Sequence, residues 1–188
     1  MKRMAVCVLV PTWAFAVLAE PVTYTLEPTH TTVTWEVVHF GTSTTRGRFE
    51  RVEGQVTLDV KEHKGNVSLQ VDMRSISTHV PPFTAVLKRK DFFDIEEYPS
   101  AFFVSDRIDF EGDRVASVRG EFTLKGVSQP LTLKATRFGC YLNPLFKREV
   151  CGGDFEAKIL RSSFGMTHSL PFVSDEIALK IQVEGIRQ

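Results

Sequence analysis

Apolar and polar residues alternate along most of this chain, and this period of two constrains its fold more than any other feature. The clearest stretches are 22–26, 33–37, 56–60, 67–73 and 177–183. Successive side chains of a β-strand point to opposite faces, so each stretch predicts a strand with one apolar and one polar face. Half-buried strands of this kind are typical of antiparallel sheets.

Turn residues divide the remainder of the chain into further predicted strands. Turns that contain Gly or Pro separate the stretches 101–110, 114–124, 131–138 and 155–161. The sequence therefore predicts eight or nine strands, mostly in sequential up-and-down order. That many antiparallel strands with a single apolar face close into a barrel or stack as a sandwich, and closure removes the exposed edges.

One segment, from Phe83 to Tyr98, breaks the alternation. It places Phe83 and Leu87 four residues apart, which predicts one or two short helical turns that end before Pro99. We therefore expect an all-β fold: an eight-stranded antiparallel barrel with one short helical insertion.

Alternation alone does not tell whether the apolar face of a barrel points inward or outward, so an outer-membrane barrel is an alternative. Such a barrel gathers aromatic residues in two girdles at its strand ends, and this sequence shows no such grouping. Five of its 15 phenylalanines lie in or just after the helical segment instead. That concentration favours a soluble barrel with an apolar interior, either hollow or filled by its own side chains.

The N-terminus has the features of a secretory signal. Lys2 and Arg3 precede a short apolar run, and small residues end that run. The run is too short for a membrane-spanning helix and is interrupted by Pro11. We predict cleavage after Ala19, with Ala16 as the alternative site, and export to the bacterial periplasm or the exterior.

Excluding residues 1–19 as a signal peptide leaves one predicted domain, residues 20–188. Cys7 leaves with the signal, so the odd cysteine count becomes an even pair, Cys140 and Cys151. In an oxidising compartment a disulfide is the default for such a pair, whereas two free thiols or a zinc site have less support. A bridge across this loop is expected to stabilise the fold by about 3 kcal/mol.

Charge and motifs argue against several classes of function. The chain has 23 basic and 23 acidic residues, so it lacks the basic excess of a nucleic-acid-binding protein. Its five histidines do not have metal-ligand spacing, and the sequence contains no nucleophile elbow or phosphate-binding loop. We therefore expect a binding protein with no catalytic cofactor and no metal site, rather than an enzyme.

Several short motifs follow one another in order along the chain. They are Tyr24-x-Leu26-x-Pro28-x-His30, His39-Phe40-Gly41-Thr42-Ser43, Gly47-x-Phe49, Asp91-Phe92-Phe93-Asp94, Gly120-x-Phe122-x-Leu124 and Arg161-Ser162-x-Phe164-Gly165-Met166. Together they resemble the YceI-like family of exported polyisoprenoid-binding proteins over nearly all of residues 20–188. The stretch from Cys140 to Asp154 is also similar to a periplasmic subgroup associated with ubiquinone-type ligands.

This resemblance implies a lipocalin-like barrel that holds one isoprenoid tail along its axis. The wall and mouth residues that it implies are Trp35, Val37, Phe40, Phe49, Phe83, Leu87, Phe92, Phe103, Phe164 and Met166. The polar residues to test for head-group contact are His39, Thr42, Thr44 and Arg161, within a hydroxyl-rich run that extends to Thr45. Gly47 and Gly165 are expected to serve turns or close approach.

The resulting prediction is an exported carrier or reservoir for a polyisoprenoid lipid, ubiquinone-like or polyprenyl. We expect a monomer or homodimer, no binding of nucleic acid, and transient contact with a membrane or a membrane redox protein. Two alternatives stay open. One is an enzyme or redox partner that acts on a quinone or lipid, which requires titratable groups that converge inside the barrel. The other is a stress-related interaction module whose apolar pocket is incidental.

Overall fold

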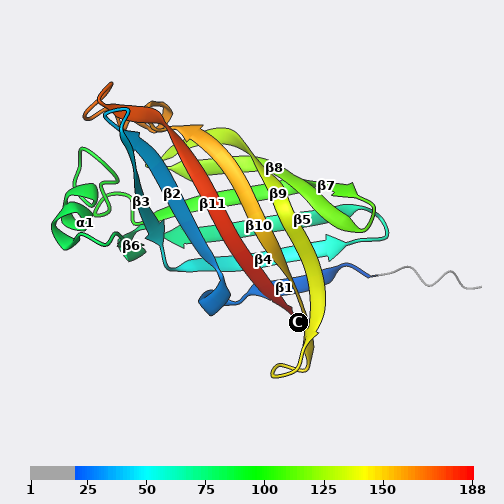
Figure 1. Ribbon diagram of the computed structural model, residues 1–188. Helices are drawn as coiled ribbons and strands as arrows, with labels where there is room; N and C mark the ends of the chain where they lie inside the picture. The colour runs from blue at the N-terminus through cyan, green and yellow to red at the C-terminus, as the bar shows by residue number, and fades with distance from the viewer. Residues whose placement is uncertain (1–19) are drawn as a thin grey trace, which may run out of the picture.

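The computed structural model describes residues 20–188, so the expected signal peptide lies outside the described residues. Strands dominate this part of the chain (Figure 1). They are β1 (Val22–Leu26), β2 (Thr32–His39), β3 (Ser43–Phe49), β4 (Val52–Asp59), β5 (Lys64–Asp72), β6 (Ile76–Ser77), β7 (Ser100–Glu111), β8 (Arg114–Leu124), β9 (Val127–Asn143), β10 (Arg148–Leu160) and β11 (Val173–Arg187). The helical elements are α1 (Pro81–Leu87) and the 3-10 helices η1 (Pro28–His30), η2 (Met73–Ser75) and η3 (Arg161–Phe164).

Eight of these strands form a closed antiparallel barrel, which confirms the expected fold. The order around the ring is β1, β4, β5, β7, β8, β9, β10 and β11, and β11 returns to β1. β11 pairs with two strands on this side, because residues 185–187 pair with β1 whereas residue 173 and residues 177–182 pair with β2. β3 and the two-residue β6 continue the sheet beyond β2. The sequence prediction missed β3, since most of its residues are polar.

The apolar faces of the strands point into the barrel. On β7, Phe103 is 6% exposed whereas its neighbour Phe102 is 43% exposed, as expected for adjacent residues on opposite faces. The outer surface carries ion pairs such as Lys180–Glu156, whose charged atoms lie 2.6 Å apart. An exposed pair of this kind contributes about 0–1 kcal/mol. The structure thus decides what alternation left open: the apolar side faces inward.

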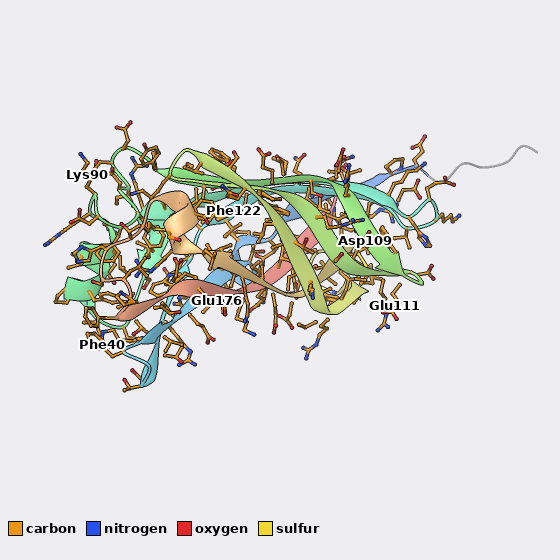
Figure 2. The ribbon with its side chains drawn as sticks, turned by 90° about the horizontal axis from the view of Figure 1, so that it is seen from above. Phe40, Lys90, Asp109, Glu111, Phe122 and Glu176 are labelled. Atoms are coloured by element: carbon orange, nitrogen blue, oxygen red, sulfur yellow. A yellow bond between two sulfur atoms is a disulfide. The ribbon has the colours of Figure 1, made fainter. Side chains whose placement is uncertain are left out.

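The two ends of the barrel differ. Phe40 and Lys90 lie at one end and Glu111 at the other (Figure 2). We call the first end the mouth and the second the far end. α1 lies at the mouth, whereas the C-terminus is at the far end (Figure 1). There the Gln188 N–H donates to the carbonyl of Thr23 at 2.9 Å, so the two ends of the described chain are neighbours.

The helical insertion forms as expected but is shorter than its sequence pattern. α1 begins at Pro81, where proline suits the first turn of a helix, and ends at Leu87. Hydrogen-bonded turns then continue to Tyr98. Lys125, in the turn between β8 and β9, holds these turns in place. Its Nζ donates to the carbonyl of Lys90 at 3.1 Å and to that of Phe92 at 2.6 Å.

The disulfide between Cys140 and Cys151 is present, which confirms the expected pairing. The two residues face each other across β9 and β10, with their Cα atoms 4.1 Å apart. Beyond them the β9–β10 hairpin extends away from the barrel (Figure 1). Within residues 20–188, no helix has the length and apolar character that a membrane span needs.

Candidate functional site

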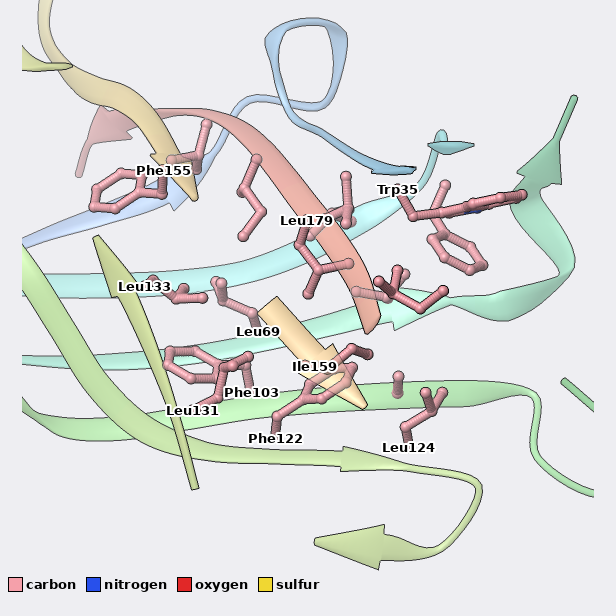
Figure 3. Close-up of a pocket in the computed structure, with 18 of the residues that line it drawn as sticks. Trp35, Leu69, Phe103, Phe122, Leu124, Leu131, Leu133, Phe155, Ile159 and Leu179 are labelled. Carbon is pink, nitrogen blue, oxygen red and sulfur yellow. The ribbon is translucent and has the colours of Figure 1, made fainter. Parts of the chain in front are cut away.

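A cavity of about 360 Å³ occupies the interior of the barrel. Its volume lies within the range of roughly 300–1,000 Å³ that is usual for small-molecule pockets. The wall consists of the inward-facing apolar side chains of the strands, and Figure 3 shows several of them converging from different strands. The labelled members are Trp35, Leu69, Phe103, Phe122, Leu124, Leu131, Leu133, Phe155, Ile159 and Leu179. The barrel is therefore hollow rather than filled.

Most of the polar residues that border the cavity belong to the segments that form the mouth. They are His39 and Thr45, on either side of the β2–β3 turn, together with Arg161, His168 and Ser169 in and after η3. No Asp or Glu is among the described residues that line the cavity. A ligand inside therefore meets apolar surface along most of its length and uncharged or basic groups at the opening.

Eight of the ten wall and mouth residues inferred from the sequence border the cavity. They are Trp35, Val37, Phe49, Phe83, Leu87, Phe92, Phe103 and Met166. Phe40 does not; it lies on the rim of the mouth, 58% exposed, and stacks on Phe172 with ring centroids 5.3 Å apart. Phe164 is buried behind the wall, with its ring 5.6 Å from that of Phe122.

The expected head-group residues divide in the same way. His39 and Arg161 border the cavity, whereas Thr42 and Thr44 do not. Thr42 belongs to the β2–β3 turn, where its hydroxyl donates to the carbonyl of His39 at 3.0 Å, and Thr44 is exposed. On β3 it is Thr45 that borders the cavity, because neighbouring strand residues point to opposite faces.

Arg161 organises the loop that follows η3. Its guanidinium donates to four backbone carbonyls, those of Met166, His168, Val173 and Ser174, at 2.8–3.0 Å. Burial lowers the pKa of Arg161, and the nearby carboxylate of Asp175 acts in the opposite direction. Arginine keeps its charge despite such a shift. With four of its five donors engaged, Arg161 shapes the mouth and has one N–H left for another partner.

The same loop has a second polar anchor. The backbone N–H and the hydroxyl of Ser162 both donate to the carboxylate of Asp175, at 2.8 and 2.6 Å. The hydroxyl hydrogen bond is the main reason that the pKa of Asp175 lies below its ordinary value; the Ser162 N–H and Arg161 add to this effect and outweigh the opposing effect of burial. Asp175 therefore stays ionised and balances part of the buried charge of Arg161.

Tyr24 contributes a polar tip near the far end of the cavity. Its ring lines the cavity, while its hydroxyl donates to Glu149 at 2.6 Å. Burial raises the pKa of Tyr24, and the hydrogen bond to Glu149 raises it further. The hydroxyl therefore stays protonated and uncharged at neutral pH.

Comparison with known proteins gives the family. The YceI-like domain matches residues 24–185. This chain belongs to the YceI-like family. Protein YceI of Salmonella arizonae is 31% identical over 163 residues, which cover 86% of this chain and 84% of the relative. Protein YceI of Salmonella enteritidis PT4 matches to the same extent.

Two solved structures have the same fold. BcnA of Burkholderia cenocepacia is 23% identical with a TM-score of 0.70, and the match covers 85% of this chain and 98% of BcnA. A polyisoprenoid binding domain from Saccharophagus degradans, implicated in plant cell wall breakdown, is 13% identical with a TM-score of 0.64. That match covers 88% of this chain and 98% of the domain.

Several cavity residues of this YceI-like chain were not singled out from its sequence. His168 and Ser169 border the mouth because the loop held by Arg161 folds over it, and no local pattern indicates that position. Leu133 and Phe155, by contrast, lie within stretches already predicted as strands, so the alternation itself could have identified them. Among residues 20–188, no cluster of His, Cys, Asp or Glu could hold a metal ion.

Proposed function

We propose that this protein is an exported carrier or reservoir for a polyisoprenoid lipid, either a ubiquinone-like quinone or another polyprenyl compound. The observation that carries the proposal is the hollow barrel, whose wall is apolar and whose polar groups gather mainly around the mouth. This distribution matches a long hydrocarbon tail with one small polar end. It offers little to a polar substrate, which needs partners along its whole length.

The physical need for such a carrier is simple. Each square ångström of apolar surface in contact with water costs about 25 cal/mol, so a long isoprenoid tail does not cross an aqueous compartment unshielded. Phenylalanine and branched aliphatic side chains, which dominate this wall, contact a methyl-branched chain closely. Binding of polyisoprenoid by the structurally similar Saccharophagus degradans domain supports the same class of ligand.

The direct test is chemical analysis of the purified protein. The full chain should be expressed in a bacterium, purified without detergent, and examined by native mass spectrometry and by organic extraction. We expect an isoprenoid lipid at up to one molecule per chain, and the extracted mass identifies its head group. Protein that repeatedly carries no lipid and takes up neither a quinone nor a polyprenol from solution contradicts the proposal.

A matched pair of variants tests whether the ligand lies inside the barrel. Phe103→Glu puts a charge on the cavity wall and should abolish lipid uptake, because a carboxylate is costly beside a hydrocarbon chain. Phe102→Glu, one residue earlier and on the outer face, should keep uptake close to that of the wild type. Phe122→Trp narrows the cavity without adding a charge and should also reduce uptake, which guards against a folding defect in Phe103→Glu. Equal uptake by all variants would mean that the lipid binds elsewhere.

Export is tested at the N-terminus. Cell fractionation should place the mature protein in the periplasm, and mass spectrometry of that fraction should give a chain that begins at Glu20. A chain that begins at Val17 identifies the alternative site. Retention of residues 1–19 in cytoplasmic protein contradicts the export part of the proposal.

A further inference from the structure

Four exposed large apolar side chains cluster on the β9–β10 hairpin, which lies away from the mouth. Leu145 is 86% exposed and Leu142 73%, while Phe146 and Tyr141 are nearly half exposed. We call residues 141–148 the tip; it projects beyond the barrel (Figure 1). Single exposed apolar residues are common on protein surfaces, but four within six positions point to a contact with another apolar phase.

The conformation of the tip is fixed by its own hydrogen bonds. Asn143 Oδ1 accepts the backbone N–H groups of Leu145 and Phe146, at 2.9 and 3.2 Å. The Lys147 N–H donates to the Asn143 carbonyl at 2.8 Å, and the disulfide joins the two strands at the base. The tip is therefore ordered before any partner arrives, which reduces the entropy lost on binding.

The charges of the tip all have one sign. Lys147 and Arg148 are its only charged residues, and neither forms an ion pair within residues 20–188. The neighbouring carboxylates are already engaged: Glu149 with the Tyr24 hydroxyl at 2.6 Å and with Arg187 at 3.5 Å, and Glu184 with the Tyr141 hydroxyl at 3.1 Å. The tip thus combines an apolar apex with two adjacent cations.

We propose that the tip docks this protein on an anionic lipid surface. Leu145 and Phe146 enter the boundary between head groups and acyl chains, and Lys147 and Arg148 contact lipid phosphates. Apolar side chains beside lysine and arginine are the combination by which peripheral proteins bind such surfaces. A protein partner fits less well, since a standard interface buries roughly 800 Å² per side over about 20–30 residues, and the tip is a narrow hairpin. The proposal goes beyond lipid carriage and does not depend on the content of the cavity.

Vesicle sedimentation with the full chain tests the proposal. The wild-type protein should bind protein-free vesicles of phosphatidylglycerol and phosphatidylcholine, bind pure phosphatidylcholine more weakly, and lose affinity in high salt. Leu145→Ser combined with Phe146→Ser should lower the affinity about tenfold or more, because the two side chains proposed to enter the membrane lose their apolar contact with lipid. Lys147→Gln combined with Arg148→Gln should lower it by roughly fivefold per charge on anionic vesicles alone.

The matched control is the outer face of β7. Phe102→Ser combined with Val104→Ser removes apolar residues that are 43% and 49% exposed, and it should leave vesicle binding unchanged. Exposed substitutions of this kind rarely alter stability by more than about 0.5 kcal/mol, and circular dichroism verifies the fold of each variant.

Three outcomes overturn the proposal. They are wild-type protein that ignores anionic vesicles, tip variants that bind as the wild type does, and binding that is lost only when Phe40 and Phe172 at the mouth become serine. Lipid content is measured on the same variants. A tip variant that carries lipid normally but no longer binds vesicles shows that docking and carriage are separate properties, whereas a lipid-free wild type counts against carriage alone.

Discussion

At the scale of single residues, Arg161 shows how one buried side chain can shape an opening. A guanidinium has five N–H donors in a fixed plane, and here four of them hold carbonyls of one loop, between Met166 and Ser174. Most of the loop is exposed, at residues 167–169 and 171–172. The side chain of Arg161 therefore gives the carbonyls of this loop the hydrogen bonds that strand pairing gives the carbonyls of the barrel.

Replacing Arg161 by lysine should destabilise the protein by about 3 kcal/mol. Lysine keeps the charge but cannot reach four separate carbonyls, so several buried acceptors lose their donors. Hydrogen exchange should quicken between residues 166 and 174, and the denaturant midpoint should fall. Lys158→Ala, which removes an exposed pair with Glu176, is the control and should cost less than about 1 kcal/mol. Similar losses in both variants would contradict this role for Arg161.

At the scale of elements, the short η1 turn lets two strands, β1 and β2, pair with the same edge of β11. The chain leaves β1 at Leu26 and begins β2 at Thr32, and both strands pair with β11. The buried carboxylate of Glu27 fixes the turn by accepting the N–H groups of Thr29 and His30 and the Thr29 hydroxyl, at 2.8–3.2 Å. His30 Nδ1 lies 2.7 Å from the same carboxylate.

This carboxylate makes the stability of the fold depend on pH. Burial alone would raise the pKa of Glu27, but the hydrogen bonds from Thr29 and His30 outweigh it and hold the pKa below its ordinary value of 4.5. The stabilisation is therefore complete above pH 4.5 and is lost as the pH falls through the lower pKa of the folded state.

Glu27→Gln should accordingly lower the unfolding free energy by about 2 kcal/mol at neutral pH. The difference from the wild type should shrink as the pH falls below the ordinary pKa, since the wild-type carboxyl is then protonated too. Denaturant titrations across the acid range measure this directly. Glu53→Gln, at an exposed position on β4, should change stability by no more than about 0.5 kcal/mol at any pH. A constant deficit in Glu27→Gln would rule out the linkage.

Another element, the β9–β10 hairpin, is stabilised by the disulfide at its base. The Cys140–Cys151 bond closes a loop with a sequence separation of 11, for which chain entropy predicts about 3 kcal/mol. The double variant Cys140→Ser, Cys151→Ser should therefore have an unfolding free energy lower than that of the wild type by about 3 kcal/mol. Reduction with dithiothreitol should lower the unfolding free energy of the wild type to that of the variant and leave the variant unchanged. Urea titrations with and without dithiothreitol test this.

At the scale of the whole molecule, the sequence predicts the barrel well and its mouth poorly. Alternation along several strands predicts the barrel, and the family resemblance supplies wall positions such as Trp35 and Phe103, which border the cavity. The mouth is built from turns whose contacts are distant in sequence, such as Lys125 with Phe92. Local patterns do not contain such contacts, which is why Thr42 was expected at the cavity and His168 was not.

The closure of the barrel by β11 also determines when the interior of the barrel becomes enclosed during folding. Among the strands in residues 20–188, β11 is the last in chain order, yet it pairs with β10, β2 and β1. Pairing between the two ends of a chain is the slowest kind of contact to form. A translocated or nascent chain therefore has no enclosed interior until β11 is available to pair with β10 and β1. We therefore expect that a ligand enters the cavity only after β11 has been made and has paired with its neighbours.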